Sequence, residues 1–214
     1  MLNPYKKNTA LLGNTMLDFD LFHQYKGLIF DMDGTVIDTM PSHAKAWEIV
    51  GKEMGYTFDG ATMYRLGGAP VRVIAQTMMQ EANMPLDRIE EVIHLKREWG
   101  KKLLLQEATL LPAAQVVKQF YQKKPLALGT GSHRVMTELL LDKFNFHQYF
   151  NAVVTAEDVH KHKPEPDTFL RCAELIKIEA KDCLVFEDAD LGVQAGLAAG
   201  MHVFDVRVNQ VIKG

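Results

Sequence analysis

Five short apolar runs, each ending in a polar residue or a glycine, constrain the fold more than any other feature of this chain. Each run has 4 or 5 residues and no alternation of apolar and polar side chains, which is typical of a strand covered on both faces of a parallel sheet. Helix-like segments separate the last four runs, and this alternation predicts an α/β fold with right-handed crossovers. The five runs are GLIFD (27–31), PLALG (125–129), AVVT (152–155), CLVFE (183–187) and HVFDV (202–206).

The connection between the first and second runs is too long for a simple crossover. About 100 residues separate Asp31 from Thr130, whereas a βαβ unit needs about 30. We therefore predict a helical cap domain at residues 41–107, inserted between two parts of an α/β core domain, 25–40 and 108–214, with residues 1–24 as an N-terminal extension. Four helix-like patterns lie in the connection, and the last is expected to pack on the sheet: Ser42–Met54, Val71–Glu81, Leu86–Leu105 and Ala113–Gln122.

The composition excludes several functional classes. The formal net charge is only −3 over 214 residues, so the chain lacks the basic footprint of a nucleic-acid-binding protein. No apolar run is long enough to span a membrane. Polar residues interrupt the N-terminal leucines, which makes this segment a poor match to a signal peptide. The two cysteines, Cys172 and Cys183, form neither a disulfide framework nor a metal pattern. We expect a cytoplasmic monomer that acts on a small molecule.

Two aspartates, Asp31 and Asp33, end the first apolar run in the sequence LIFDMDGTVIDT. Residues i and i+2 of an extended segment share a face, and ligands of open α/β sheets bind beyond the carboxyl ends of the strands. The two carboxylates are therefore expected to converge on a ligand. Gly34 permits a turn, and its N–H group and that of Thr35 can face an anion.

Polar side chains also follow three of the other runs. Thr130 and Ser132 follow the second run, where their hydroxyls can donate to a phosphate, although Ser132 can equally cap the next helix. Lys163 follows the third run and is either a cation of the site or a solvated lysine. Glu187 and Asp188 end the fourth run. Carboxylates, a hydroxyl and a cation together suit a hard divalent ion with a phosphate group.

The ordered set of motifs resembles that of the haloacid dehalogenase superfamily of phosphotransferases. DMDGT, Thr130, KPEPD and EDADLG stand in the order of the four family motifs, from Tyr25 onwards. The helical insertion resembles the cap of the β-phosphoglucomutase-like subgroup, and FDMDGTVIDTMPSHAKAW and HKPEPDTFLRCAE are most similar to fructose-1-phosphate or 6-phosphogluconate phosphatases. The resemblance implies a Mg²⁺-dependent phosphatase that acts on small sugar phosphates; the alternative is a β-phosphoglucomutase-type phosphomutase.

The same resemblance implies a role for each motif residue. Asp31 would be the nucleophile that forms an aspartyl-phosphate, and Asp33 would protonate the leaving alcohol and then activate water. Thr130 and Lys163 would hold the phosphoryl oxygens. The implied magnesium ligands are Asp31, Asp33 through its backbone carbonyl, Asp188, and Glu187 directly or through water.

The resemblance also implies further substrate contacts, and some of these residues have a second possible role. His43 occupies the position of a histidine in the mutase motif, but it can also be a helix-surface histidine. Arg72 lies one position away from the mutase arginine that holds a distal phosphate, and Lys96 is one of several basic residues on its helix. His133 stands where the mutase has a lysine, and these departures favour a phosphatase. The remaining implied substrate contacts are Gly34, Thr35, Gly131 and Ser132.

Overall fold

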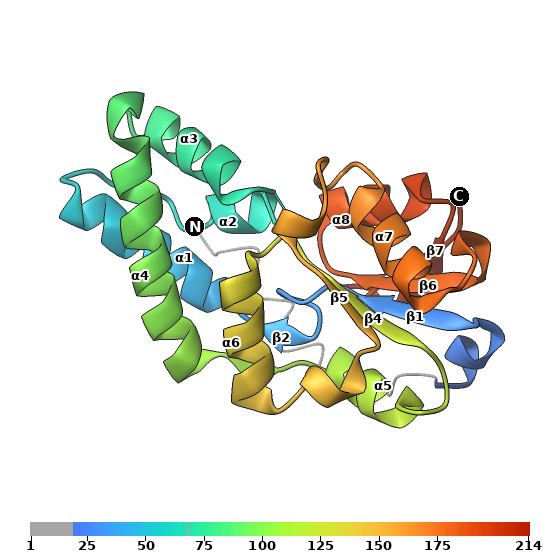
Figure 1. Cartoon of the computed structure of the whole chain (residues 1–214). Coiled ribbons are helices and arrows are strands. Elements are labelled where there is room, and N and C mark those ends of the chain that lie inside the picture. The colour runs from blue at the N-terminus through green and yellow to red at the C-terminus, as the bar shows by residue number, and fades with distance from the viewer. Residues whose placement is uncertain (1–18, 68) are drawn as a thin grey trace.

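The computed structural model describes residues 19–67 and 69–214. Its main feature is a six-stranded sheet in the order β5-β4-β1-β6-β7-β8, which Figure 1 shows at the centre of the larger part of the molecule. The first five of these strands run parallel, and β8 pairs antiparallel with β7. The strands are β1 (Gly27–Phe30), β4 (Leu126–Gly129), β5 (Ala152–Val154), β6 (Cys183–Glu187), β7 (His202–Asp205) and β8 (Gln210–Ile212). The α/β fold predicted from the sequence is confirmed.

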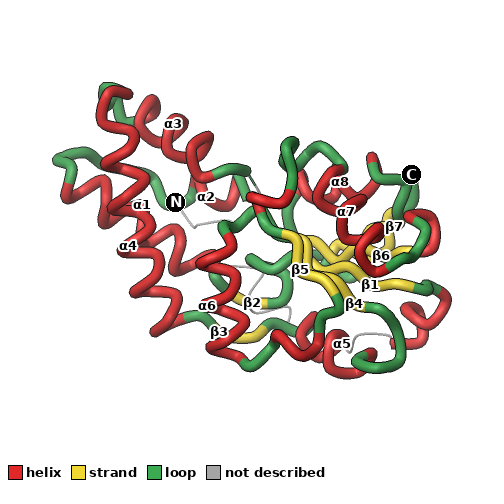
Figure 2. The backbone as a smooth tube through the Cα atoms, in the orientation of Figure 1, coloured by secondary structure: helices red, strands yellow, loops and turns green. Residues whose placement is uncertain are grey.

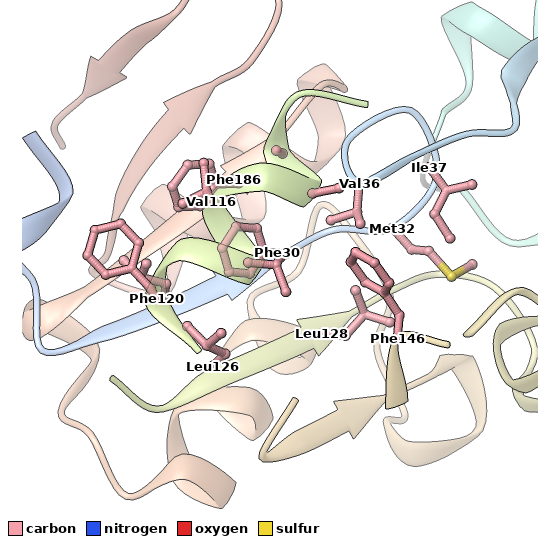
Figure 3. Close-up of a cluster of buried hydrophobic side chains, with 14 of the residues drawn as sticks. Phe30, Met32, Val36, Ile37, Val116, Phe120, Leu126, Leu128, Phe146 and Phe186 are labelled. Carbon is pink, nitrogen blue, oxygen red and sulfur yellow. The ribbon is translucent and has the colours of Figure 1, made fainter. Parts of the chain in front are cut away.

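Helices cover both faces of this sheet, which explains why its central strands carry no polar alternation. One face packs on α5 (Ala113–Phe120) and α6 (Arg134–Phe144), and the other on α7 (Asp167–Ile176) and α8 (Asp190–Ala198). Figure 3 shows the first of these two cores, where Phe30 and Phe186 of neighbouring strands lie among buried side chains of α5. The two rings stack with their centroids 4.5 Å apart.

A second group of helices, between β1 and β4 in the chain, has a hydrophobic core of its own. Trp47, Met78 and Val92 are at its centre and are fully or almost fully buried. Figures 1 and 2 show these helices beside the sheet and its covering helices. They are α1 (Met40–Glu53), α2 (Thr62–Arg65), α3 (Val71–Glu81) and α4 (Ile89–Glu107), with the short 3-10 helix η3 (Leu86–Arg88) before α4.

The elements of this helical segment differ in detail from those that the sequence predicts. The helix predicted over 86–105 is divided into η3 and α4, and α2 has only four residues, too few for a periodic pattern to show. Two very short strands, β2 (Ile37–Asp38) and β3 (Thr109–Leu110), pair antiparallel where the chain enters and leaves the segment. The division into a core and a cap domain at residues 41 and 107 stays a prediction.

The described part of the N-terminal extension packs against the sheet core. Residues 1–18 of the predicted extension lie outside the described residues, and 19–24 form the 3-10 helix η2 (Phe19–Gln24). Phe22 is fully buried and meets the ring of Phe186 edge-on at 4.9 Å between centroids. Among the described residues, no helix combines the length and the apolar character needed to cross a bilayer.

Lys143 of α6 ties the far end of the helical segment to the sheet part of the molecule. Its ammonium donates hydrogen bonds to the carbonyl oxygens of Leu104 and Ala108, at 3.0 and 2.7 Å. These carbonyls lie at the end of α4, where a cation complements the helix dipole; the Leu104 carbonyl also accepts the N–H group of Ala108 at 3.2 Å. The chain therefore leaves the helical segment at a fixed position relative to α6.

Replacement of Lys143 by Met should lower the free energy of unfolding by about 2 kcal/mol, because two charge-assisted hydrogen bonds to the carbonyls of two buried residues are lost. Urea denaturation measures this change. Lys123→Met, at an exposed lysine, is the matched control and should change stability by less than about 0.5 kcal/mol. Equal effects of the two substitutions would contradict the role assigned to Lys143.

Candidate active site

The carboxyl ends of β1, β4 and β6 and the loop after β5 meet at a cavity of about 540 Å³. The strand partners Phe30–Leu128 and Phe30–Phe186 lie level in the sheet, so the residues that follow them emerge at the same edge. Side chains of α1, α3 and α4 line the other side of the cavity, together with Met63 of α2. A cavity of this size is in the range of small-molecule sites.

Lys163 connects two of the strand ends. Its ammonium donates hydrogen bonds of 2.6 Å to the carboxylates of both Asp31 and Glu187. All three residues are at most 4% exposed, and the Lys163 ammonium also lies 4.6 Å from the ring centroid of Phe169. Burial alone would lower the pKa of Lys163, but the two carboxylates raise it above the ordinary value. Lys163 is therefore a buried cation of the cluster and not a solvated lysine.

The carboxylate of Glu187 also holds the start of α8. While its Oε1 accepts from Lys163, its Oε2 accepts the backbone N–H groups of Asp188 and Ala189, each at 2.7 Å. Gly192 in the first turn of α8 leaves space for this carboxylate, because a Cβ at that position would lie 1.7 Å from Oε1. Glu187 is thus fixed by Lys163 and by the first backbone N–H groups of α8.

Asp31, Glu187 and Asp188 form an acidic group in which one carboxylate oxygen from each residue lies within 4.8 Å of the other two. Burial and the neighbouring Glu187 raise the pKa of Asp188 to about 7, and burial raises the pKa of Asp31 well above its ordinary value against the opposing effect of Lys163. Carboxylates in this situation are stabilised as anions by a cation. Hard oxygen donors of this kind fit Mg²⁺, so the residues present fit the metal that the sequence predicts.

Asp33 faces the cavity beside Asp31 but has a different set of partners. Thr39 and Ser132 donate their hydroxyl groups to its two oxygens at 2.7 and 2.6 Å, and Thr130 donates at 3.3 Å. The Nε2 atom of His43 lies 3.4 Å from Asp33 Oδ1. Burial alone would raise the pKa of Asp33, but the hydrogen bonds from His43, Ser132 and Thr39 together hold it below the ordinary value.

Lys96 of α4 extends this network into the helical segment. Its ammonium lies 3.0 Å from Nδ1 of His43, and since lysine only donates, Nδ1 accepts and the ring proton faces Asp33. Burial lowers the pKa of Lys96 to about 8, and burial together with Lys96 lowers the pKa of His43. His43 is 5% exposed, so it is not a helix-surface histidine.

The structure does not place every predicted site residue as expected. The N–H groups of Gly34 and Thr35 donate to Ile37 and Met32 carbonyls within the turn, so they do not face an anion in the cavity. Gly34 has φ +87° and approaches Asp188 so closely that a Cβ would lie 2.2 Å from its Oδ2, and the Thr35 hydroxyl donates to Asp188 at 3.0 Å. Both residues position Asp188 rather than contact the main cavity.

Two other expectations are corrected. Ser132 does not cap α6, because the helix begins at Arg134 with His133 at the N-cap and the Ser132 hydroxyl is directed to Asp33. Arg72 does not line the cavity; its guanidinium pairs with Glu90 on the neighbouring helix, and the side chain is 53% exposed. Gly131, Ser132, His43 and Lys96 do line the cavity, as do Asp31, Asp33, Thr130, Glu187 and Asp188.

Some residues of the site are absent from the sequence-based prediction. Thr39 is fully buried and donates to Asp33; its place in the same short motif, six residues after Asp33, is a signal that could have found it. Arg97, Lys101 and Glu157 also line the cavity. No spacing links these three residues to the motifs, because folding alone brings α4 and the loop after β5 to the cavity.

The parallel sheet, the polar strand ends and the helical segment over them define an α/β enzyme with a helical insertion. Residues 28–206 match the family model of haloacid dehalogenase-like hydrolases. The chain therefore belongs to the haloacid dehalogenase-like hydrolase family, as the order of the four motifs indicates.

Known proteins of this family show the same similarity along nearly the whole chain. Fructose-1-phosphate phosphatase YqaB of Escherichia coli is 43% identical over 88% of this chain and 100% of its own length. Beta-phosphoglucomutase of Bacillus subtilis is 27% identical over 88% of this chain and 86% of its own. The crystal structure of beta-phosphoglucomutase from Clostridium difficile superposes with a TM-score of 0.73 at 20% identity, covering 85% of this chain and 84% of that one, and supports the fold.

Replacement of Gly192 by Ala should disturb the buried ion pairs, because the added methyl group occupies the space of the Glu187 carboxylate. We expect the free energy of unfolding to fall by at least about 2 kcal/mol, measured by urea denaturation. Gly100→Ala in the middle of α4 is the matched control: its Cβ would meet only the Lys96 side chain, at 3.7 Å or more, and helix propensity favours Ala. A variant as stable as the wild type would show that Glu187 can move freely.

Proposed function

We propose that this enzyme is a Mg²⁺-dependent phosphatase that hydrolyses small sugar phosphates of the fructose 1-phosphate type through an aspartyl-phosphate. The observation that carries the proposal is the pair of carboxylates at the cavity floor with different environments. Asp31 is held by the Lys163 ammonium, and Asp33 by hydroxyl groups and His43. Two carboxylates with different partners can take different roles, one as the nucleophile and the other as the proton carrier. The similarity to YqaB, whose name specifies fructose 1-phosphate, supports this substrate class.

In the first step, a carboxylate oxygen of Asp31 attacks phosphorus while the bond from phosphorus to the alcohol oxygen breaks. Lys163 fixes Asp31 and offsets its charge as the phosphate dianion approaches. The approaching phosphate dianion raises the pKa of Asp33 from its low value in the free site, so Asp33 takes up a proton from solvent and gives it to the leaving oxygen. Thr130 and Ser132 hold Asp33 in place. The products of this step are the alcohol and an aspartyl-phosphate.

In the second step, Asp33 accepts a proton from a water molecule, whose oxygen attacks the phosphorus of the aspartyl-phosphate. The bond from phosphorus to Asp31 breaks, and inorganic phosphate and the free carboxylate result. Asp31, Asp188 and the backbone carbonyl of Asp33 would hold Mg²⁺, with Glu187 close by, and the bound ion supplies positive charge next to the transferring phosphoryl group. Side chains of the helical segment line the side of the cavity opposite the strand ends.

A β-phosphoglucomutase-type activity is the second candidate, because Lys96, Arg97 and Lys101 line the cavity and offer cations for a second phosphate group. The arginine expected for that purpose from the sequence, Arg72, is paired with Glu90 away from the cavity. This placement favours the phosphatase.

Purified protein with Mg²⁺ should release inorganic phosphate from fructose 1-phosphate, and chelation with EDTA should abolish the release. A screen of phosphorylated metabolites with a phosphate assay measures the substrate range. Interconversion of hexose phosphates that depends on a bisphosphate activator, without net phosphate release, would instead identify the mutase.

With acetyl phosphate, whose leaving carboxylate needs no proton from Asp33, replacement of Asp33 by Asn should trap the aspartyl-phosphate, because an amide cannot take the proton of the attacking water. Steady-state phosphate release should fall by about 100- to 10,000-fold, and intact-protein mass spectrometry after a rapid acid quench should detect a phosphorylated protein. Asp31→Asn is the control and should give neither turnover nor adduct. Fast phosphate release by the Asp33 variant would assign the proton transfer to another group.

A further inference from the structure

Arg97 makes a contact across the cavity from the helical segment to the sheet part of the molecule. Its Nη2 atom lies 3.0 Å from Nε2 of His133, at the N-cap of α6. Both side chains line the cavity. The contact therefore joins α4 to the loop that follows β4, the same loop that carries Thr130 and Ser132.

The direction of each hydrogen bond in this contact follows from arginine having donors only. Nε2 of His133 must accept from Arg97, so the ring proton resides on Nδ1 and is donated to Glu157 Oε1 at 2.8 Å. The other carboxylate oxygen of Glu157 accepts the backbone N–H of Arg134 at 2.9 Å. Although burial opposes it, these hydrogen bonds lower the pKa of Glu157 to about 2. Glu157, His133 and Arg97 thus form a hydrogen-bonded series in which the donor and acceptor of each bond are fixed.

This hydrogen-bonded series orients the guanidinium of Arg97 without neutralising its charge. In an ordinary surface ion pair a carboxylate contacts the guanidinium directly. Here the neutral imidazole of His133 lies between the Glu157 carboxylate and the Arg97 guanidinium. Within residues 19–67 and 69–214, no ion pair joins Arg97 to an aspartate or glutamate. Only one of its five N–H donors is engaged by a described residue. Lys101, one helical turn further along α4, lines the same cavity and adds positive charge.

The position of this hydrogen-bonded series relative to Asp33 indicates which part of a substrate the Arg97 guanidinium can contact. Ser132 contacts Asp33, and His133 is the next residue of the loop. A leaving group whose oxygen is protonated by Asp33 would therefore extend into the part of the cavity that Arg97 and His133 line. The remaining donors of Arg97 suit acceptor oxygens, either hydroxyl or carboxylate.

We propose that Arg97 is a specificity-determining residue that binds acceptor oxygens at the end of the substrate remote from the phosphoryl group, with His133 and Glu157 as its positioning residues. This proposal rests on the phosphatase activity proposed above and adds the group that selects the leaving alcohol. Arg72, which the sequence suggested for the remote end, lies outside the cavity.

The test compares substrates that have and lack a remote end. In Arg97→Gln, kcat/KM for fructose 1-phosphate should fall about 10- to 100-fold, the range for loss of a charged hydrogen bond, mainly through KM. With acetyl phosphate, which has no remote end, kcat/KM should stay within about twofold. Arg88→Gln is the matched control: Arg88 flanks the same helix, pairs with Glu91 and does not line the cavity, so both substrates should be unaffected.

His133 variants test the positioning role. His133→Leu should reproduce the selective loss for fructose 1-phosphate, and the Arg97→Gln/His133→Leu double variant should be no worse than Arg97→Gln alone, because the two residues act as one unit. His133→Gln, whose amide oxygen can accept from Arg97, should recover part of the activity. A purely structural contact would instead lower the thermal stability and the turnover of both substrates together.

A comparison of 6-phosphogluconate with fructose 1-phosphate identifies the acceptor. A larger loss in Arg97→Gln with 6-phosphogluconate assigns a carboxylate, and a larger loss with fructose 1-phosphate assigns hydroxyl groups. Unchanged discrimination between fructose 1-phosphate and acetyl phosphate in Arg97→Gln would overturn the inference. If the wild-type protein hydrolyses neither substrate, nor any other phosphate ester, the proposed function itself fails.

Discussion

The buried ammonium of Lys163 is the interaction on which the rest of the site depends. Its hydrogen bonds to Asp31 and Glu187 connect β1 and β6 with the loop after β5. Burying three charged groups costs several kcal/mol per ion, and this cost is offset only when all three keep their partners. The position of each strand end therefore constrains the others, and the carboxylate of Asp31 is held before any ligand arrives.

The same electrostatic requirement shapes the start of α8. Two carboxylates in sequence, Glu187 and Asp188, would repel each other in a buried strand end, but they point to different partners. Glu187 faces Lys163 and the first N–H groups of the helix, whereas Asp188 accepts from Thr35 and lies against Gly34. The helix dipole also favours negative charge at this point. Glu187 is thus held by Lys163 and the helix start, whereas Asp188 lines the cavity.

The sequence predicts those parts of the fold and site whose signal is local. The five parallel strands end within a residue or two of the predicted positions, because apolar runs buried on both faces have clear limits. The antiparallel strand β8, with only three residues, has no such run. The sequence also predicts the turn after Asp33, but it does not predict where the N–H groups of the turn point. The same Asp-Gly turn can direct these groups outwards or, as here, to carbonyl oxygens within the turn.

Contacts between the helical segment and the sheet could not be predicted in the same way. Arg72 and Arg97 are both arginines on amphipathic helices, and only the packing of α3 and α4 decides that the first meets Glu90 while the second reaches His133. This difference has a chemical basis. The phosphoryl group needs the same charges whatever alcohol it leaves, so its ligands can lie in short motifs at strand ends. The alcohol needs a surface matched to its own shape and polar groups. The long connection after β1 lines the cavity opposite the strand ends, and helices that pack on their own core can change their cavity-facing residues without disturbing Lys163 and its partners.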